Sequence, residues 1–468
     1  MELTRFCANV LVSEATKEES TWLINYLTLP PRKFSGPGPS YPTRLYFGGK
    51  EIRFGSGLLG SVLASAAKDG LIVNVTDARG NPPRKDPHGD TSWLRDYQKL
   101  AVHKAIEKGN GILWLPTGAG KTEIAVGLVN SIDCEWLFLV HRGTLVDQAA
   151  ARYKKRTGRT AGRVKSGKWS GALRPERFTV ATFQSVWRNR HKPEIKNMLR
   201  QVQGIIVDEA HTVGASSYQK VALSTVNAYY RIGLSGTPLQ RTDDKTSFVI
   251  AVLGPPIYRI SANALISRGA IVKPNIKMLK VTQTSAKRPT TYNKVYKSHV
   301  VNSNVRNAAV VNIVRNVAKP ALVFVRALAH GKRIMDMLNS IGIDTELVSG
   351  KDFDTSRQSK IRRLETGKIV VLVTTVVFQE GIDIPELRSV VVASGGASGI
   401  ATIQRVGRAM RVVDGKSFCT VWDIFDQGER WLSNQSYKRK KSYTAEGYEV
   451  KVLDSKVFSG KQQNLHII

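Results

Sequence analysis

Residues 111–129 read GILWLPTGAGKTEIAVGLV, which is an apolar run, a glycine-rich turn and a helical pattern in succession. Ile112–Leu115 predicts a buried strand and Glu123–Val129 a helix. A turn of this kind lets backbone amides approach phosphate groups, while Lys121 reaches the β and γ phosphates and Thr122 can bind Mg²⁺. The sequence therefore predicts a nucleotide site with Mg²⁺, formed by Pro116, Thr117, Gly118, Ala119, Gly120, Lys121 and Thr122.

A pair of carboxylates follows a second apolar run. Ile205–Val207 predicts a strand, and Asp208 and Glu209 come directly after it, 87 residues beyond Lys121. An isolated acidic pair at this position is more often a solvated loop end. Behind a phosphate-binding loop, however, it lies at the carboxyl edge of the sheet, where ligands of open α/β folds bind. Asp208 is then expected to hold Mg²⁺, and Glu209 to polarise the attacking water or accept its proton.

Apolar, β-branched runs alternate with helical patterns through most of the chain, as expected for doubly wound parallel sheets. The first series is 112–115, 136–140, 178–181, 205–207 and 232–234, and the second is 321–325, 345–348, 369–373, 389–392 and 417–422. Two such sheets in tandem are predicted. Residues 276–305 are a mixed stretch near the junction between the two series.

Turn-forming residues at 30–40 and 79–90 bracket a smaller unit at the N-terminal end. Within it, 45–54 predicts a hairpin around Gly48-Gly49, 58–68 a helix and 71–75 a strand. The expected organisation is α/β. A small α+β accessory domain, 1–90, precedes a first parallel-sheet domain, 91–275, a second one, 276–430, and a basic C-terminal tail, 431–468.

The 468 residues carry 70 Lys and Arg against 37 Asp and Glu, which gives a formal net charge of +33. Such a charge indicates a polyanionic partner, and nucleic acid is expected ahead of an anionic membrane surface. Residues 1–90 hold 11 basic and 9 acidic side chains, so the excess lies in the later part. The longest apolar run, 369–378, is about half of the roughly 20 residues that span a bilayer, so no membrane contact is predicted. No secretory signal is recognised.

The three cysteines, Cys7, Cys134 and Cys419, are far apart and lack the spacing of a disulfide framework. We therefore expect a reducing compartment such as the cytoplasm.

The order of motifs from residue 91 to 425 resembles the superfamily 2 helicases and translocases. In that family the PTGAGKT string is typical, and the resemblance implies two RecA-like domains that use ATP and Mg²⁺. It also implies that Gln98, together with Arg95, reads adenine. The resemblance further places Arg142 of motif Ia, and Thr182, Gln184 and Ser185 of motif Ib, on the nucleic-acid strand.

In the second series, the resemblance implies strand contacts by Arg326 of motif IV, Ser349 and Gly350 of a backbone-gripping turn, and Thr374 of motif V. Gly381 and Asp383 would lie near the nucleotide. The string QRVGRAMR, 404–411, resembles motif VI, which implies that Arg408 and Arg411 are arginine fingers and that Gln404 belongs to the catalytic set. Arginines supplied by a second domain stabilise transition-state charge only when the domains close, which couples hydrolysis to motion.

Residues 253–258 and 264–269 resemble the branch that contains XPB-like and phage UvsW-like DNA motors. The resemblance implies an ATP-dependent DNA helicase that remodels forks or four-way junctions, with branched DNA as its partner. The resemblance leaves RNA open as the substrate, and for a protein of phage origin it implies the host cytoplasm as the compartment. The alternatives are an RNA helicase, a restriction-type duplex translocase, and a nucleic-acid-binding scaffold with a vestigial ATPase.

Basic segments supply further candidate contacts with the polyanion. The eight basic residues between Arg152 and Lys168, with no acidic one among them, predict phosphate contacts, and Lys154, Lys155 and Arg156 are the chosen candidates. A solvated loop is the alternative. The run Lys438–Lys441 is either a nucleic-acid tail or a soluble terminus.

Overall fold

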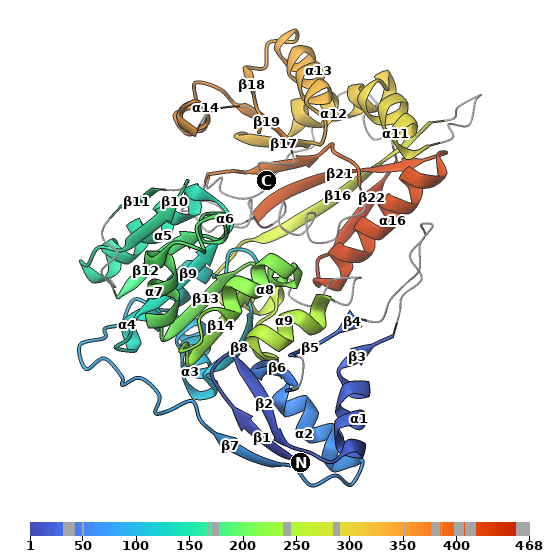
Figure 1. The fold of residues 1–468 in the computed structure, drawn as a ribbon. Coiled ribbons are helices and arrows are strands. Elements are labelled where there is room, and N and C mark those ends of the chain that lie inside the picture. Colours follow the sequence, from blue (N-terminus) through green and yellow to red (C-terminus); the bar gives the residue numbers. More distant parts are fainter. Residues whose placement is uncertain are drawn as a thin grey trace. The chain divides into compact units, whose positions relative to one another are not determined.

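The computed structural model describes residues 1–30, 43–48, 51–166, 168–170, 177–236, 245–283, 291–350, 352, 354–375, 384, 386–396, 407 and 418–454. The chain divides into two compact units (Figure 1). Residues 1–116 and 120–260 make the first unit, and residues 117–119 and 261–468 make the second. Each unit is described by itself below.

The first unit contains an eight-stranded sheet in the order β11-β10-β12-β9-β13-β14-β8-β15. All strand pairs in it are parallel except β10 with β11. The strands are β8 (Asn110–Trp114), β9 (Trp136–Val140), β10 (Gly162–Lys165), β11 (Lys168–Ser170), β12 (Phe178–Thr182), β13 (Gly204–Asp208), β14 (Tyr230–Ser235) and β15 (Pro256–Arg259). Its helices are α3 (Asp96–Lys108), α4 (Lys121–Ser131), α5 (Gly143–Thr157), α6 (Phe183–Arg188), α7 (Pro193–Gln201), the 3-10 helix η2 (Ala210–Gly214), α8 (Ser216–Leu223) and α9 (Lys245–Leu253).

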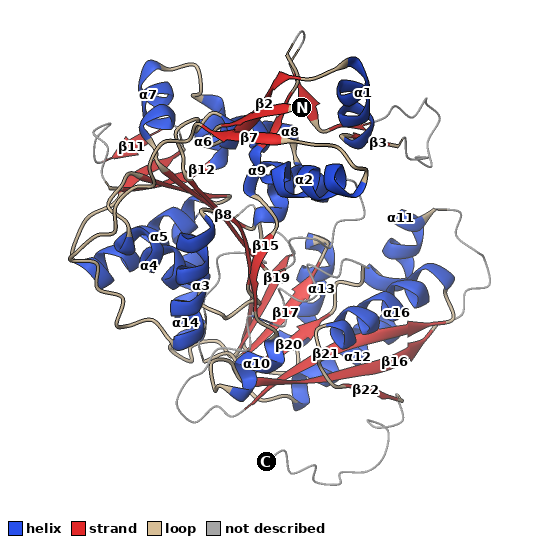
Figure 2. Cartoon of the chain, turned by 90° about the horizontal axis from the view of Figure 1, so that it is seen from below, coloured by secondary structure: helices blue, strands red, loops and turns tan. Residues whose placement is uncertain are grey.

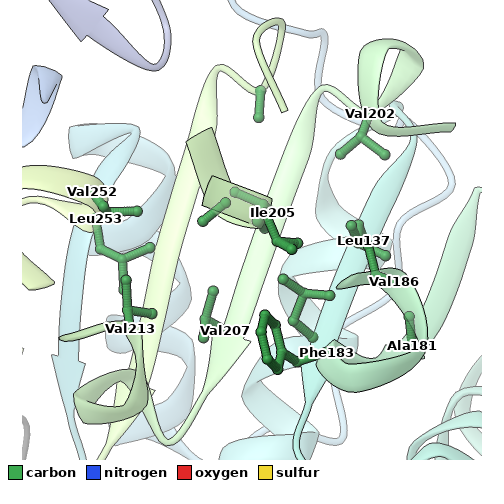
Figure 3. Close-up of a cluster of buried hydrophobic side chains, with 14 of the residues drawn as sticks. Leu137, Ala181, Phe183, Val186, Val202, Ile205, Val207, Val213, Val252 and Leu253 are labelled. Carbon is green, nitrogen blue, oxygen red and sulfur yellow. The ribbon is translucent and has the colours of Figure 1, made fainter. Parts of the chain in front are cut away.

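Helices cover both faces of this sheet, with α3, α4 and α5 together on one face (Figure 2). The other face packs on α6, α7, α8 and α9 through a buried apolar cluster. Figure 3 shows Ile205 and Val207 of β13 in that cluster beside Leu137 of β9 and Phe183 of α6. Because these strands are buried on both faces, they read as continuous apolar runs, which is why the sequence predicts them. Full burial of such a side chain stabilises the folded state by about 1.5–3 kcal/mol.

The accessory module at the N-terminal end is a small α+β layer. Its five-stranded sheet has the order β5-β6-β2-β1-β7. The elements are β1 (Glu2–Arg5), β2 (Asn9–Glu14), α1 (Lys17–Tyr26), β5 (Tyr46–Phe47), β6 (Arg53–Gly55), the 3-10 helix η1 (Ser56–Leu58), α2 (Leu59–Lys68) and β7 (Asn74–Asp77), with β3 (Thr28–Leu29) and β4 (Thr43–Arg44) as a separate pair. The predicted hairpin is present, since β5 pairs antiparallel with β6.

The accessory module is docked on α9 of the same unit. Its apolar cluster includes the buried Ala251, and Phe248 and Ile250 pack against it. The approach is close at two glycines. A Cβ at Gly55 would lie 2.2 Å from the Ala251 carbonyl oxygen, and one at Gly57 would lie 1.9 Å from the Ile250 carbonyl oxygen. The module is therefore packed backbone to backbone against α9 of the first unit.

The second unit contains a seven-stranded sheet in the order β18-β19-β17-β20-β21-β16-β22, and every pairing is parallel. The strands are β16 (Lys273–Thr282), β17 (Ala321–Val325), β18 (Thr345–Val348), β19 (Val371–Thr375), β20 (Ser389–Val392), β21 (Phe418–Gln427) and β22 (Val450–Leu453). The helices are α10 (Ala262–Ser267), α11 (Tyr292–Val295), the π-helix η3 (Tyr296–Val301), α12 (Asn304–Asn316), α13 (Leu328–Asn339), α14 (Asp354–Glu365) and α16 (Arg430–Ala445). Helices α12 and α13 pack on the strands through one apolar cluster.

Two stretches of the second unit differ from the sequence-based expectation. Residues 276–282, expected as mixed structure at a junction, belong to the ten-residue strand β16, in which Pro274, Ile276 and Met278 are buried and alternate with more exposed residues. Its lysines mask this period-two pattern. Residues 430–453, expected mainly as a basic tail, form α16 and β22.

Within the part of the chain that the structure describes, no helix has both the length and the apolar character needed to cross a membrane. The three cysteines are free thiols.

Candidate functional site

The parallel pairing of the first sheet brings the predicted nucleotide-site motifs to one edge. Strands β9, β13, β14 and β8 are neighbours in that order. The Asp208-Glu209 pair, Ser235 with Gly236, and the phosphate-binding loop lie at the carboxyl ends of the last three. The loop is tied to the neighbouring strand, because the Leu115 amide donates to the Ser235 carbonyl oxygen at 2.9 Å. Side chains far apart in sequence thus meet at the carboxyl edge.

Glycine is required in the phosphate-binding loop for two separate reasons. Gly118 and Gly120 adopt positive φ angles of +89° and +77°, and Gly120 caps the N-terminus of α4 in the left-handed conformation. Gly120 also faces a neighbour, since a Cβ there would lie 2.4 Å from Nε2 of Gln98. Gln98 is buried, and its Oε1 accepts from the Arg95 amide at 2.9 Å. The residue expected to read adenine therefore lies against the loop.

Lys121 and Glu209 form the centre of the site. The Lys121 ammonium donates to Oε1 of Glu209 at 3.0 Å, and both side chains are largely buried. The Ser235 hydroxyl donates to Oε2 of Glu209 at 3.4 Å, and His211 Nδ1 lies 3.4 Å from the same oxygen and 3.2 Å from the Ser235 hydroxyl oxygen. Two polar side chains therefore hold the carboxylate that the sequence assigns to water activation.

The backbone at Glu209 is also unusual. Its φ of +49° and ψ of +58° place a non-glycine residue in the left-handed region. This conformation costs an ordinary residue about 1–3 kcal/mol and often marks functional sites. Here it ends β13 and starts η2, which turns the side chain of Glu209 towards Lys121.

Asp208 has the features expected of a Mg²⁺ ligand. Its Oδ1 is buried and has no hydrogen-bond partner. Burial raises the pKa of Asp208 to about 6, with a further contribution from the adjacent Glu209 carboxylate, while Lys121 and His141 act in the opposite direction. A buried carboxylate oxygen without a donor is costly, and a bound cation would relieve that cost. With Thr122 in the first turn of α4, the donor set fits Mg²⁺, which prefers hard oxygen ligands.

The sequence did not reveal the role of Trp114. The apolar pattern suggests a core residue, yet Trp114 is only half-buried, and its indole Nε1 donates to the Gly236 carbonyl oxygen at 2.6 Å. The Arg259 guanidinium lies 4.3 Å from its ring centroid. Trp114 therefore links the strand before the phosphate-binding loop to the turn after β14. The only signal in the sequence would have been an indole N–H donor two residues before Pro116, where the phosphate-binding loop begins.

Five of the eight basic residues around α5 form ion pairs with acidic residues of the first unit. Glu123 of α4 accepts from Arg156 at 3.0 Å and also pairs with Arg152. Further ion pairs join Lys165 and Arg163 to Asp147, and Arg159 to Asp86. Lys154 and Lys155 remain exposed. Arg156, a predicted phosphate contact, is instead engaged with the helix that follows the phosphate-binding loop.

The residues expected to line the nucleic-acid strand in the first unit have structural partners. Thr182 and Ser185 are buried, and their hydroxyl groups bond to each other at 2.8 Å in the N-terminal cap of α6. Gln184 is exposed, and its Nε2 donates to the His141 carbonyl oxygen at 3.2 Å, which joins motif Ib to motif Ia. Arg142 is half-buried at the start of α5.

The expected nucleic-acid contacts of the second unit also gather at one sheet edge, at the carboxyl ends of β17, β18 and β19. The Ser349 amide and hydroxyl both donate to Oδ2 of Asp352, at 2.6 and 2.9 Å. Arg357 donates to the Gly350 carbonyl oxygen at 2.9 Å. Thr374 is fully buried, whereas Arg326 is exposed and lies 5.4 Å from the Tyr296 ring centroid.

Five predicted site residues lie outside the described residues: Gly381, Asp383, Gln404, Arg408 and Arg411. Their roles remain predictions from the sequence.

Comparison with known proteins identifies the class. Residues 92–240 match the family model described as type III restriction enzyme, res subunit, and residues 305–413 match the helicase conserved C-terminal domain. Together the matches cover more than half of the chain and hold the motifs described above. The chain therefore belongs to superfamily 2 of the ATP-dependent helicases, and its two parallel sheets are the tandem RecA-like domains of that class.

Within this class, the chain is similar to the ATP-dependent DNA helicase uvsW of Enterobacteria phage T4, with 26% identity over 79% of this chain and 74% of uvsW. It is likewise 26% identical to the DNA 3'-5' helicase XPB of Kineococcus radiotolerans, over 79% of this chain and 66% of that protein. The predicted similarity to the UvsW-like and XPB-like branch is thus confirmed. The chain spans about half to two thirds of the length of the first curated relatives it matches.

A solved structure supports the fold alone. The ATP-dependent type ISP restriction-modification enzyme LlaBIII bound to DNA aligns with a TM-score of 0.58 at 17% identity, over 84% of this chain and 34% of that one.

Proposed function

We propose that this protein is an ATP-driven motor on DNA that remodels branched duplexes, such as forks and four-way junctions. The observation that carries the proposal is the cluster of Lys121, Glu209 and Ser235 beside the partnerless Oδ1 of Asp208. These groups provide what phosphoryl transfer requires, namely charge neutralisation and a positioned base. An intact constellation of this kind argues against a scaffold with a vestigial ATPase.

In this proposal each residue of the cluster has one task. Lys121 binds the β and γ phosphates, and Glu209 accepts a proton from the attacking water while Ser235 and His211 orient its carboxylate. Asp208 and Thr122 would hold Mg²⁺, which neutralises phosphate charge when it is bound.

Other residues complete the proposed reaction. Arg408 and Arg411, from the second motor domain, stabilise the charge of the transition state, and Gln404 belongs to the same catalytic motif. Gln98, with Arg95, contacts adenine, and Gly381 and Asp383 lie near the nucleotide. These assignments follow the helicase motifs of the sequence.

DNA is the proposed substrate because the net charge is +33 and similar proteins are named DNA helicases. The preference for branched DNA is assigned to the accessory module of residues 1–90. This module is close to neutral, so it gains little affinity from counterion release and would contribute by recognising shape. Its tight packing on α9 supports the proposal, because a module fixed to the motor lobe holds its recognition surface in a constant orientation.

A restriction-type duplex translocase is the second candidate, because residues 92–240 match the res-subunit model. The deciding experiment measures ATP hydrolysis with single-stranded DNA, linear duplex, forked DNA, a four-way junction and RNA, with Glu209→Gln as the inactive control. If the protein remodels branched DNA, forked DNA and the four-way junction should stimulate ATP hydrolysis most. The protein should also move the strands of these two substrates. Equal stimulation by linear duplex would favour the translocase, and stimulation by RNA alone would favour an RNA helicase.

A further inference from the structure

Helix α16, Arg430–Ala445, has two faces of opposite character. Its buried residues recur at the spacing of one helix face, and they are Leu432, Ser436, Arg439 and Tyr443. This face packs on β21 and is fixed by the buried ion pair between Arg439 and Asp423, whose Nε and Oδ2 lie 2.9 Å apart. Figure 1 shows α16 in red alongside β21 and β22. The buried face therefore fixes the helix on the sheet, and the opposite face is exposed.

The exposed face carries two large aromatic side chains. Trp431 is 42% exposed and Tyr437 is 60% exposed. The Tyr437 ring meets the buried Phe425 edge to face, with centroids 5.0 Å apart. This contact holds one edge of the tyrosine ring against the sheet while most of its area stays open. Because the buried face fixes the helix, exposed aromatic area of this size can stack on planar groups of another molecule.

Positive charge surrounds these rings. Arg430, Lys438 and Lys441 are exposed, and at helical spacing they share the outward face with Trp431 and Tyr437. No acidic residue occurs between positions 430 and 445. Among the described residues, no ion pair engages these three cations, in contrast to Arg152, Arg156, Arg159, Arg163 and Lys165 near α5. These three cations are therefore available to bind phosphates, as are the exposed Lys154 and Lys155 of α5.

We propose that the outward face of α16 binds single-stranded nucleic acid, with bases stacked on Trp431 and Tyr437 and phosphates bound by Arg430, Lys438 and Lys441. Stacking on aromatic rings combined with phosphate contacts is how proteins hold unpaired strands without reading sequence. The bases of a duplex are already stacked on one another, so the rings favour an unpaired strand. The proposal deepens the proposed motor function and rests on it, since a remodelling motor generates unpaired strands.

The test measures binding of the full-length chain, without ATP, to three probes of equal length: oligothymidylate, an abasic oligonucleotide and a duplex. The variant Trp431→Ala/Tyr437→Ala is expected to lose about tenfold or more in affinity for oligothymidylate, because stacking is worth about 1–3 kcal/mol per base. Its affinity for the abasic oligonucleotide and for duplex should stay within about twofold. Trp431→Phe, which keeps an aromatic ring, should retain most of the affinity.

The charge variant Lys438→Ala/Lys441→Ala should weaken binding of both single-stranded probes and lower the salt slope by about 0.7 for each lost phosphate contact. Lys332→Ala/Lys368→Ala removes the same charge from exposed positions elsewhere in the second unit and is the matched control. It should leave the slope unchanged. Thermal unfolding checks that each variant is folded.

Unchanged oligothymidylate affinity in the aromatic variant would overturn the proposal, and so would an equal loss for duplex and oligothymidylate. ATP hydrolysis separates this failure from that of the proposed function. If no nucleic acid stimulates the unaltered chain, the motor function is wrong. If stimulation is normal and the aromatic variant still binds oligothymidylate normally, only the surface on α16 is wrong.

Discussion

Gly57 is the position where one added methyl group should loosen the accessory module from the first motor lobe. A Cβ there would lie 1.9 Å from the Ile250 carbonyl oxygen and 2.5 Å from the Gly254 amide nitrogen. Both are backbone atoms, so no side chain can rotate away. Gly57 is not in the left-handed region, so the cost of Gly57→Ala is steric. Overpacking of this kind costs about 1–3 kcal/mol, which should raise the opening of the module roughly 5- to 150-fold.

Gly60 provides the matched control, because it is three residues away in α2 and a Cβ there would meet nothing within 4 Å. Gly60→Ala should be neutral or stabilising, by up to about 1 kcal/mol, since alanine favours a helix over glycine. The assay is amide hydrogen exchange in β2 and α2, which reports local opening. Faster exchange in Gly57→Ala, slower or equal exchange in Gly60→Ala, and loss of fork remodelling only in the former are expected. Wild-type exchange in Gly57→Ala would refute the steric reasoning.

Three further predictions address the motor itself. Lys121→Ala and Glu209→Gln should each abolish most nucleic-acid-stimulated ATP hydrolysis while nucleic-acid binding persists, and wild-type turnover in either variant would disprove the site. Arg408→Ala should leave ATP binding within a few-fold but lower turnover by roughly 10³ or more, which single-turnover kinetics can separate. Lys154→Ala/Lys155→Ala should reduce the salt slope of duplex binding by at most about 1.8, and an unchanged slope would mean that these lysines are only solvated.

The strands of both motor domains could be predicted because their apolar runs are continuous. Trp136–Val140 and Ala321–Val325 are strands at the predicted residues. Strand β16 was missed for the opposite reason, since its lysines interrupt the apolar pattern and leave only a period-two alternation. A single sequence shows continuous burial more clearly than one-sided burial.

The ion pairs of the basic segments were harder to predict from the sequence than the motifs of the nucleotide site. The basic run at 152–168 looks unpaired in the sequence because its partners, Glu123, Asp147 and Asp86, lie outside it. Conversely, Arg439 in the basic run near the C-terminal end is fully buried with Asp423. Ion pairing depends on which elements the fold places together, and no local pattern contains that information. The nucleotide site was easier to predict because short motifs define its chemistry.

The ion pair between Lys121 and Glu209 makes nucleotide binding an exchange reaction. A phosphate group that binds the ammonium competes for it with the carboxylate, which lies 3.0 Å away. Glu209 then keeps Ser235 and His211 as neighbours but loses its cation, and a carboxylate without a cationic partner is a stronger base. In the proposed mechanism, the substrate thereby activates the group that deprotonates water. Without a phosphate on Lys121, the same lysine holds the carboxylate and lowers its basicity, so the base reaches full strength only when a substrate is present.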